Sequence, residues 1–297
     1  MIILGVNGWY ERSHDASACI VKDGRLIAAV EEERLSRRRH AYDTMPTQSV
    51  AWCLDRCGIT VNDIDAVAVG WDVPRLYDLH GRQAPFQSEA EYLDILLPRG
   101  SFGVRKRTIP VHFVEHHLAH AASAFYLSGF PSSLVLIMDG QGEDVSTTVW
   151  EGKEASLRKI TSFPVSLSLG YLFEAASSFI GLSITHAGKT MGLSGYTSPP
   201  TQELVRLTES GYDLIEPFES KPSNVQLDEQ SQMLEHWSKI FVELFGEANP
   251  RRYGFSRRQG ILSPNPLMTT REQTVAALVQ REVERVAMHL TETFTRQ

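Results

Sequence analysis

Residues 1–35 read MIILGVNGWYERSHDASACIVKDGRLIAAVEEERL, and this stretch decides the fold. It holds three apolar runs, at 1–8, 16–24 and 25–35, that are rich in β-forming residues. Asp23-Gly24 lies between the second run and the third, and this pair is a strong hairpin signal. The pattern predicts three consecutive strands joined by tight turns.

Helices and strands alternate in the rest of the chain. A helix from Pro46 to Cys57, ending at Gly58, precedes a buried strand in IDAVAVGW. The second round comprises a strand at 111–116, a small-residue helix at 117–129, strands at 133–143, 146–152 and 154–163, an apolar helix at 169–181, a glycine-rich loop at 186–200 and an amphipathic helix at 271–294. Strand hairpins followed by helices, given twice, predict an α/β fold with mixed sheets flanked by helices.

Two subdomains are expected, 1–110 and 111–297, because 297 residues suffice for two packed lobes. Residues 72–108 are charged and without clear periodicity, which predicts an irregular insertion or cover. Residues 200–270 are polar and predict a variable region of short helices, with one strand near YDLIEPF.

Charge and composition exclude several classes of function. The net charge of −7 disfavours nucleic-acid binding, which needs a basic surface. No apolar run reaches the roughly 20 residues of a spanning helix, and the amino terminus does not have the pattern of a signal peptide. Three cysteines give no disulfide framework. We therefore expect a cytoplasmic protein that binds neither membrane nor nucleic acid.

A histidine pair is the sharpest chemical signal. In EHHLAHAASAFYLSGF, His116 and His120 are four apart, so on a helix they lie on one face and can present two imidazoles to one ion. Imidazole suits iron, zinc and nickel. Helical pairs of this spacing also arise by chance, so spacing alone leaves metal binding and an ordinary structural role equally open.

The second signal is LIMDGQGE, an apolar strand that ends in Asp139 with Gly140 and Gly142 beyond it. A strand fixes the carboxylate, and glycines let backbone N–H groups approach an anion. Asp-Gly is also a common hairpin turn, which is the simpler interpretation if the motif stands alone. Beside the histidine helix, Asp139 becomes the expected third metal ligand.

Three weaker signals complete the set. The amino-terminal hairpin carries Gly8 and then His14-Asp15 before a strand of small residues, like a first phosphate loop. EEERLSRRRH offers arginines as donors to phosphate oxygens, or else is a solvated basic turn balanced by its glutamates. Lys189 lies in the glycine-flanked HAGKTMGLSGY, where a lone lysine is weak evidence.

Taken together and in this order, these pieces resemble the carbamoyltransferases of antibiotic and nodulation-factor biosynthesis. The resemblance spans residues 1 to about 196 and is most specific in the histidine helix and in KTMGLSGY. It implies an actin-like (ASKHA, ribonuclease H-like) fold and iron(II), or another divalent metal, on His116, His120 and Asp139. It implies cofactor contacts at Gly8, Gly140, Gly142 and Lys189.

The resemblance also implies a two-stage reaction. Carbamoyl phosphate and ATP give a carbamoyl-adenylate, normally on a YrdC-like domain, and the actin-like part passes the carbamoyl group to a hydroxyl or amine of a small-molecule acceptor. His14 and Asp15 would act near the carbamoyl-adenylate. Arg39 stands where the family carries the lysine of Arg-x-Lys-His, so a fixed charge is expected there.

One departure limits this resemblance. The sequence up to Gln297 lacks the Gly-Gly-x-Ala-Leu-Asn turn, a later metal aspartate and a YrdC-like domain. We therefore expect an incomplete second lobe, a chain that is inactive alone, and a YrdC-like partner in the same or another chain; a homodimer is left open. Two alternatives remain, namely a non-catalytic actin-like scaffold subunit of a biosynthetic complex and a sugar-kinase-like phosphotransferase.

Overall fold

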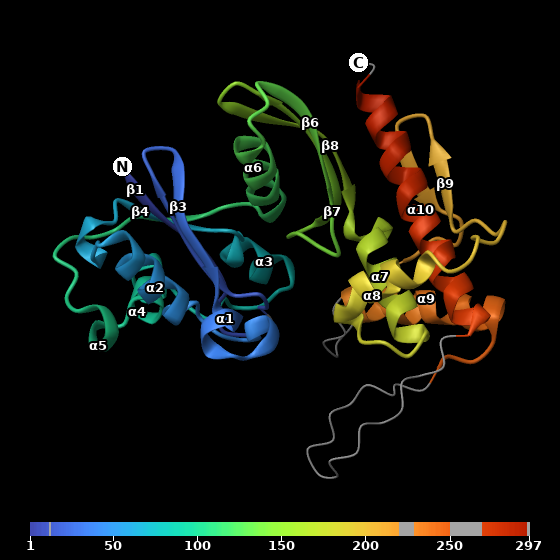
Figure 1. The fold of residues 1–297 in the computed structure, drawn as a ribbon, viewed down its shortest axis with the longest axis horizontal. Coiled ribbons are helices and arrows are strands. Elements are labelled where there is room, and N and C mark those ends of the chain that lie inside the picture. Colours follow the sequence, from blue (N-terminus) through green and yellow to red (C-terminus); the bar gives the residue numbers. More distant parts are fainter. Residues whose placement is uncertain (12, 220–228, 250–268, 296–297) are drawn as a thin grey trace, which may run out of the picture. The chain divides into compact units, whose positions relative to one another are not determined.

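The computed structural model describes residues 1–11, 13–219, 229–249 and 269–295 (Figure 1). They form two compact units, Met1–His120 and Ala121–Gln297, and each is described by itself. The sequence placed the boundary after residue 110, whereas the units divide inside α6 (His116–Ser128). Within the described ranges, we find no helix whose length and apolar character would let it cross a bilayer.

The first unit is built on a mixed five-stranded sheet. Its strands are β1 (Ile2–Asn7), β2 (Ser17–Lys22), β3 (Arg25–Glu31), β4 (Ala66–Val69) and β5 (Val111–Phe113), in the order β3-β2-β1-β4-β5. The first three pair antiparallel, and β4 and β5 run parallel to β1. This is the strand order of the ribonuclease H-like unit, and it confirms the predicted α/β class with mixed sheets.

A helix packs against the antiparallel side of this sheet. It is α2 (Thr47–Cys57), which contacts β2 and β3. The predicted stop at Gly58 is confirmed, since this glycine adopts a left-handed φ of 65° beyond the last turn. At the other end, the buried carboxylate of Glu32 accepts the N–H groups of Gln48 and Ser49. Glu32 thus caps the helix from a neighbouring element.

The third strand is shorter than predicted. It ends at Glu31, and the chain continues into α1 (Glu32–Ser36) and the 3₁₀ turn η1 (Arg39–Ala41). Glu32 begins α1, and its buried carboxylate caps α2.

The expectation of an irregular stretch at 72–108 is wrong. The segment contains α3 (Val73–Leu79), α4 (Glu89–Leu96) and α5 (Arg99–Phe102). Tyr77 and Tyr92 from these helices lie in the core of the first unit. The segment is therefore part of the core, not a cover over it. A 3₁₀ turn, η2 (Val61–Asp63), lies before β4.

The second unit opens with an antiparallel sheet of β6 (Ser132–Met138), β7 (Val145–Lys153) and β8 (Ser156–Pro164), in that order. Its other described elements are η3 (Val165–Leu167), α7 (Leu169–Phe179), η4 (Ile184–His186), α8 (Ala187–Ser194), the β9 (Val205–Thr208) and β10 (Gly211–Leu214) hairpin, α9 (Glu229–Phe245) and α10 (Thr270–Thr295). The predicted hairpin strands, the apolar helix and the final amphipathic helix are confirmed.

Packing among helices supplies the second core. On α9, Met233, Trp237 and Phe241 recur every fourth residue and are fully buried. They belong to the same cluster as side chains of α7 and α10. Each such side chain contributes roughly 1.5–3 kcal/mol when it leaves water. Within the predicted variable region 200–270, the strand near YDLIEPF is β10, while 220–228 and 250–268 lie outside the described residues.

A buried carboxylate fixes the segment after α8 to α10. Glu282 is fully buried and accepts the N–H groups of Leu204 and Val205 at 3.0 and 2.9 Å. Arg281 and Arg285 neutralise it through their guanidinium groups at 2.7 and 3.0 Å. Arg281 also donates to the carbonyls of Pro200 and Gln202.

We expect Glu282→Ala to lower the free energy of unfolding by roughly 3–5 kcal/mol, because it leaves two partly buried guanidinium groups and two buried N–H groups uncompensated. Glu284→Ala is the matched control: it is exposed on the same helix, and a change within about 0.5 kcal/mol is expected. Urea unfolding followed by circular dichroism measures both. Equal effects of the two substitutions would contradict a buried network at Glu282.

Candidate metal and carbamoyl site

The functional residues of the first unit follow its parallel strands. Because β1, β4 and β5 are parallel, their carboxyl ends meet at one edge of the sheet. Gly8 and His14 follow β1, Gly70 and Trp71 follow β4, and His116 follows β5. Open α/β sheets bind ligands at this edge.

The helix α6 presents the histidine pair as the spacing predicts. The Nε2 atoms of His116 and His120 face each other at 2.9 Å. Two nitrogens that each lie about 2.1 Å from one ion, at about a right angle, are about 3 Å apart. The pair therefore has the geometry of two neighbouring ligands of one metal ion.

The surroundings of His116 set its tautomer. Its Nδ1 lies 2.9 Å from the carbonyl oxygen of Gly70, which can only accept, so Nδ1 carries the proton. Nε2 then keeps its lone pair for an ion, as in metal-binding histidines oriented by a backbone carbonyl. Trp71 stacks on the same imidazole, with ring centres 3.7 Å apart and planes inclined by 19°.

Asp139 belongs to the second unit, where it follows β6. Its N–H donates to Ser146, and its carboxylate accepts the Gly140 N–H at 2.6 Å. A side chain on Gly170 would place its Cβ 2.6 Å from the Asp139 carbonyl, so this glycine permits the start of α7 to touch the turn. Ser168 closes the contact by donating to the Gly140 carbonyl at 2.6 Å. The backbone of the turn is thus held in place, and the union of the Asp139 carboxylate with the histidine pair remains a prediction.

The glycine N–H groups of this turn are engaged within it. Gly140 donates to the Asp139 side chain, and Gly142 donates to the Val145 carbonyl at 2.6 Å. A phosphate would have to replace these bonds, so cofactor binding at the two glycines stays a prediction. In the first unit, Gly8 has a φ of 121°, and an added Cβ would lie 2.9 Å from both Ala16 and the Thr44 carbonyl. Gly8 is therefore required for close packing of the loop.

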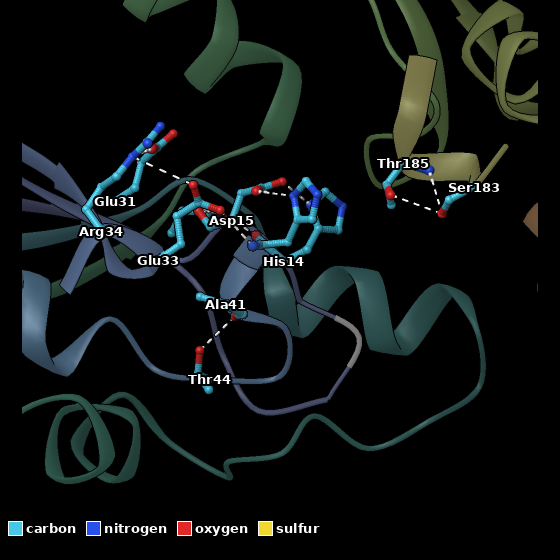
Figure 2. Close-up of polar contacts among 11 residues, drawn as sticks. His14, Asp15, Glu31, Glu33, Arg34, Ala41, Thr44, Ser183 and Thr185 are labelled. Atoms are coloured by element: carbon cyan, nitrogen blue, oxygen red, sulfur yellow. Dashed lines mark hydrogen bonds and ion pairs between the residues drawn. The ribbon is translucent and has the colours of Figure 1, made fainter. Parts of the chain in front are cut away.

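His14 and Asp15 lie together (Figure 2), and His40 is hydrogen-bonded to the same carboxylate. The Asp15 carboxylate bonds His14 Nδ1 at 2.7 Å and His40 Nδ1 at 2.9 Å. Burial alone would raise the pKa of Asp15, but the hydrogen bonds from His40 and His14 outweigh it and hold the pKa below its ordinary value. The carboxylate is therefore ionised at neutral pH.

One arginine of the arginine-rich segment is paired with glutamates. Arg34 binds Glu31 at 2.8 Å and lies 3.7 Å from Glu33, so the balanced, solvated turn describes this residue, and an anion site at the other arginines stays a prediction. Arg39, expected to be a fixed charge near the carbamoyl group, is exposed in η1. Its role remains a prediction.

The expected glycine-rich loop around Lys189 is wrong. Residues 187–194 form α8, which packs against α10 and α7, and this packing outweighs the low helix propensity of Gly188 and Gly192. Lys189 is exposed on this helix, with Nζ 3.4 Å from the His186 imidazole.

Sequence reasoning missed three contributors. Gly70 and Trp71 orient His116, and His40 shares the Asp15 carboxylate. The available signals were the Gly-Trp pair at the end of a buried strand and the histidine that closes EEERLSRRRH.

The family model described as Carbamoyltransferase N-terminus matches residues 2–95 and 86–297. An uncharacterized protein of Synechocystis sp., sll1178, is 32% identical over 98% of this chain and 48% of its own length. Nodulation protein NolNO of Sinorhizobium fredii is 37% identical over 68% of this chain and 30% of its own length. The chain thus spans about half, or less, of the length of these curated relatives.

Among solved structures, component A of the (R)-2-hydroxyglutaryl-CoA dehydratase of Acidaminococcus fermentans aligns with 98% of this chain and 78% of its own, at a TM-score of 0.44 and 11% identity. That likeness is too distant to add to the sequence evidence. The family model covers nearly every residue, including the histidine helix and the Asp139 turn. The chain therefore belongs to the family of carbamoyltransferases that this amino-terminal model defines.

Proposed function

We propose that the protein moves a carbamoyl group from carbamoyl-adenylate, made from carbamoyl phosphate and ATP, to a hydroxyl or amine of a small natural product. Membership of the carbamoyltransferase family supports the reaction class. The observation that carries the proposal is the His116–His120 pair, whose Nε2 atoms lie 2.9 Å apart beside a carbonyl that fixes the tautomer.

In this proposal His116, His120 and Asp139 hold iron(II) or another divalent metal. Two imidazoles and one carboxylate leave ligand positions open, as catalytic sites require. A bound divalent ion supplies Lewis-acid polarisation of the carbamoyl carbonyl. The backbone contacts of Gly170 and Ser168 keep the Asp139 turn in one conformation, which favours a preorganised ligand.

His14 is the residue that we place against the acceptor. Its side chain is 64% exposed, while its Nδ1 is held by Asp15. This leaves the far side of the imidazole available to orient the acceptor and to stabilise charge that develops on it. A YrdC-like domain is the proposed source of the carbamoyl-adenylate.

Metal binding tests the site without reference to activity. We expect one Fe²⁺ per chain under anaerobic conditions, measured by isothermal titration calorimetry and elemental analysis. His120→Ala and Asp139→Asn should each weaken binding by at least about tenfold, the loss seen even for residues that only orient ligands. His112→Ala is the matched control, since this histidine is exposed on β5, and it should bind like the parent.

An unchanged Fe²⁺ affinity in His120→Ala would contradict the proposed metal site. A chain that binds no ion would favour the scaffold alternative. If His120→Ala loses Fe²⁺ affinity while Asp139→Asn binds Fe²⁺ like the parent, the histidines are metal ligands and Asp139 is not.

Carbamoyl transfer tests the reaction. Labelled carbamoyl phosphate, ATP, a separately supplied YrdC-like domain and an aminoglycoside as probe acceptor should yield a carbamoylated product, detected by mass spectrometry. His14→Ala should lower its rate about 100-fold or more, the usual contribution of a proton-handling side chain. Glu284→Ala should leave the rate unchanged. Phosphorylated acceptor without carbamoyl phosphate would instead support the phosphotransferase alternative, and product formed without the added domain would contradict the expected need for it.

A further inference from the structure

Asp15 lies in a network of hydrogen bonds that joins two loops of the first unit. Figure 2 shows the labelled His14, Asp15 and Glu33 gathered beside the turn that carries Ala41. The backbones of the two loops are joined, because Asp15 N–H donates to the His40 carbonyl at 2.6 Å and Asp43 N–H donates to the Ser13 carbonyl at 2.9 Å. Asn7 adds two side-chain bonds of 3.1 Å, to the carbonyls of residues 14 and 15.

This arrangement holds the backbone in unfavourable conformations. Asp15, His40 and Ala41 all have positive φ, at 53°, 59° and 38°. Non-glycine residues adopt this region at a cost of order 1–3 kcal/mol each, and such residues gather where function requires a fixed geometry. The conformation of both loops is what brings the His40 imidazole to the Asp15 carboxylate.

The hydrogen bonds define the protonation of both imidazoles. An ionised carboxylate only accepts, so each ring nitrogen bonded to it must carry a proton. Asp15 takes His40 Nδ1 on Oδ1 and His14 Nδ1 on Oδ2. In its neutral form, each ring therefore carries its proton on Nδ1 and keeps a lone pair on Nε2, the reverse of the tautomer that free histidine prefers in water.

The two histidines differ in exposure. The His14 side chain is 64% exposed, whereas that of His40 is 23% exposed and its Nε2 atom is buried, with no hydrogen-bond partner among the described residues. The backbone N–H of His40 is bound by Glu33 at 2.7 Å, and Glu33 in turn lies near Arg34. His40 is thus the anchored partner, and His14 is the one that a substrate can reach.

We propose that His40 is a positioning residue: through the Asp15 carboxylate it holds His14 with its proton on Nδ1, so that Nε2 faces outward as a proton acceptor for the substrate hydroxyl. A single hydrogen bond from His14 would leave the carboxylate free to rotate. The second bond, on the other oxygen, fixes the rotation. This inference rests on the proposed function, since it assigns the atom of His14 that takes part.

In the proposed reaction, His14 takes one proton from the acceptor, and AMP is the leaving group. As the acceptor oxygen forms its bond to the carbamoyl carbon, the O–H proton passes to His14 Nε2. The bond from that carbon to the phosphate oxygen of the adenylate breaks with its electron pair, and AMP leaves. The resulting imidazolium is stabilised by the Asp15 carboxylate on Nδ1.

A cation could also draw these groups together, because Asp15, Glu33 and His40 offer ligand atoms within 4.8 Å of one another. A cation would take the same Asp15 oxygen and His40 nitrogen that now bond each other. The two interpretations therefore give different results when a chelator is added.

The test reads the tautomer directly. Long-range ¹H–¹⁵N correlation spectra of histidine-labelled chain, at pH 7.5 with EDTA, should show His14 protonated on Nδ1, with the resonance assigned from a His14→Asn sample. His40→Ala should return His14 to the Nε2-protonated majority of free histidine. His40→Asn should retain the parent tautomer, because its amide keeps a donor near the position of Nδ1 and asparagine tolerates positive φ.

Circular dichroism and the melting temperature establish that each variant is folded. Should His40→Ala fail to fold, Asp15→Asn gives the same readout, with the Nδ1-protonated fraction of His14 expected to fall. A parent His14 protonated on Nε2, an unchanged tautomer in folded His40→Ala, an unchanged tautomer in Asp15→Asn, or loss of the tautomer on adding EDTA would each overturn the proposal. These spectra need no turnover, so a failed transfer assay beside the expected tautomer would count against the proposed function alone.

Discussion

The parallel pairing of β1, β4 and β5 is the constraint on which the first unit's chemistry depends. The register sets Val6 beside Val69 and Val69 beside Phe113, so three chain segments leave the sheet at one edge. Gly70 N–H extends the ladder to the Val6 carbonyl, and Val114 N–H extends it to the Val69 carbonyl. Backbone hydrogen bonds, which do not depend on side-chain identity, therefore bring the three loops together.

Aromatic contacts at this edge link residues that are far apart in sequence. Trp9 meets Trp71 edge to face at 5.7 Å, and Trp71 stacks on His116. Trp9 is buried, so the loop after β1 is held against the loop after β4 by apolar packing. The orientation of the His116 ring is fixed on one side by this stack and at Nδ1 by the Gly70 carbonyl. This combination explains why a short strand and a half-exposed helix can hold a histidine in one rotamer.

Local patterns predicted the strands, the helix α2 and the face shared by His116 and His120, because these depend on periods of two and of 3.6 residues. The helices at 72–108 were missed although Ser88 caps the Glu91 N–H. The charged residues between Tyr92 and Leu96 obscured the helical spacing of these two buried side chains. The helix α8 was missed because its glycines favour a loop when packing is ignored.

The contact between His40 and Asp15 was missed for a different reason. Its contact with Asp15 depends on positive φ values at both residues, and such conformations are set by tertiary contacts rather than by local preference. The first unit thus uses one rule twice. Where Nδ1 donates to a neutral carbonyl, as at His116, Nε2 is directed at a second imidazole and suits an ion. At His14, Nδ1 donates to the Asp15 carboxylate, and Nε2 keeps the lone pair in the same way. In both cases the acceptor bonded to Nδ1, rather than the residue type alone, decides which ring nitrogen keeps the lone pair.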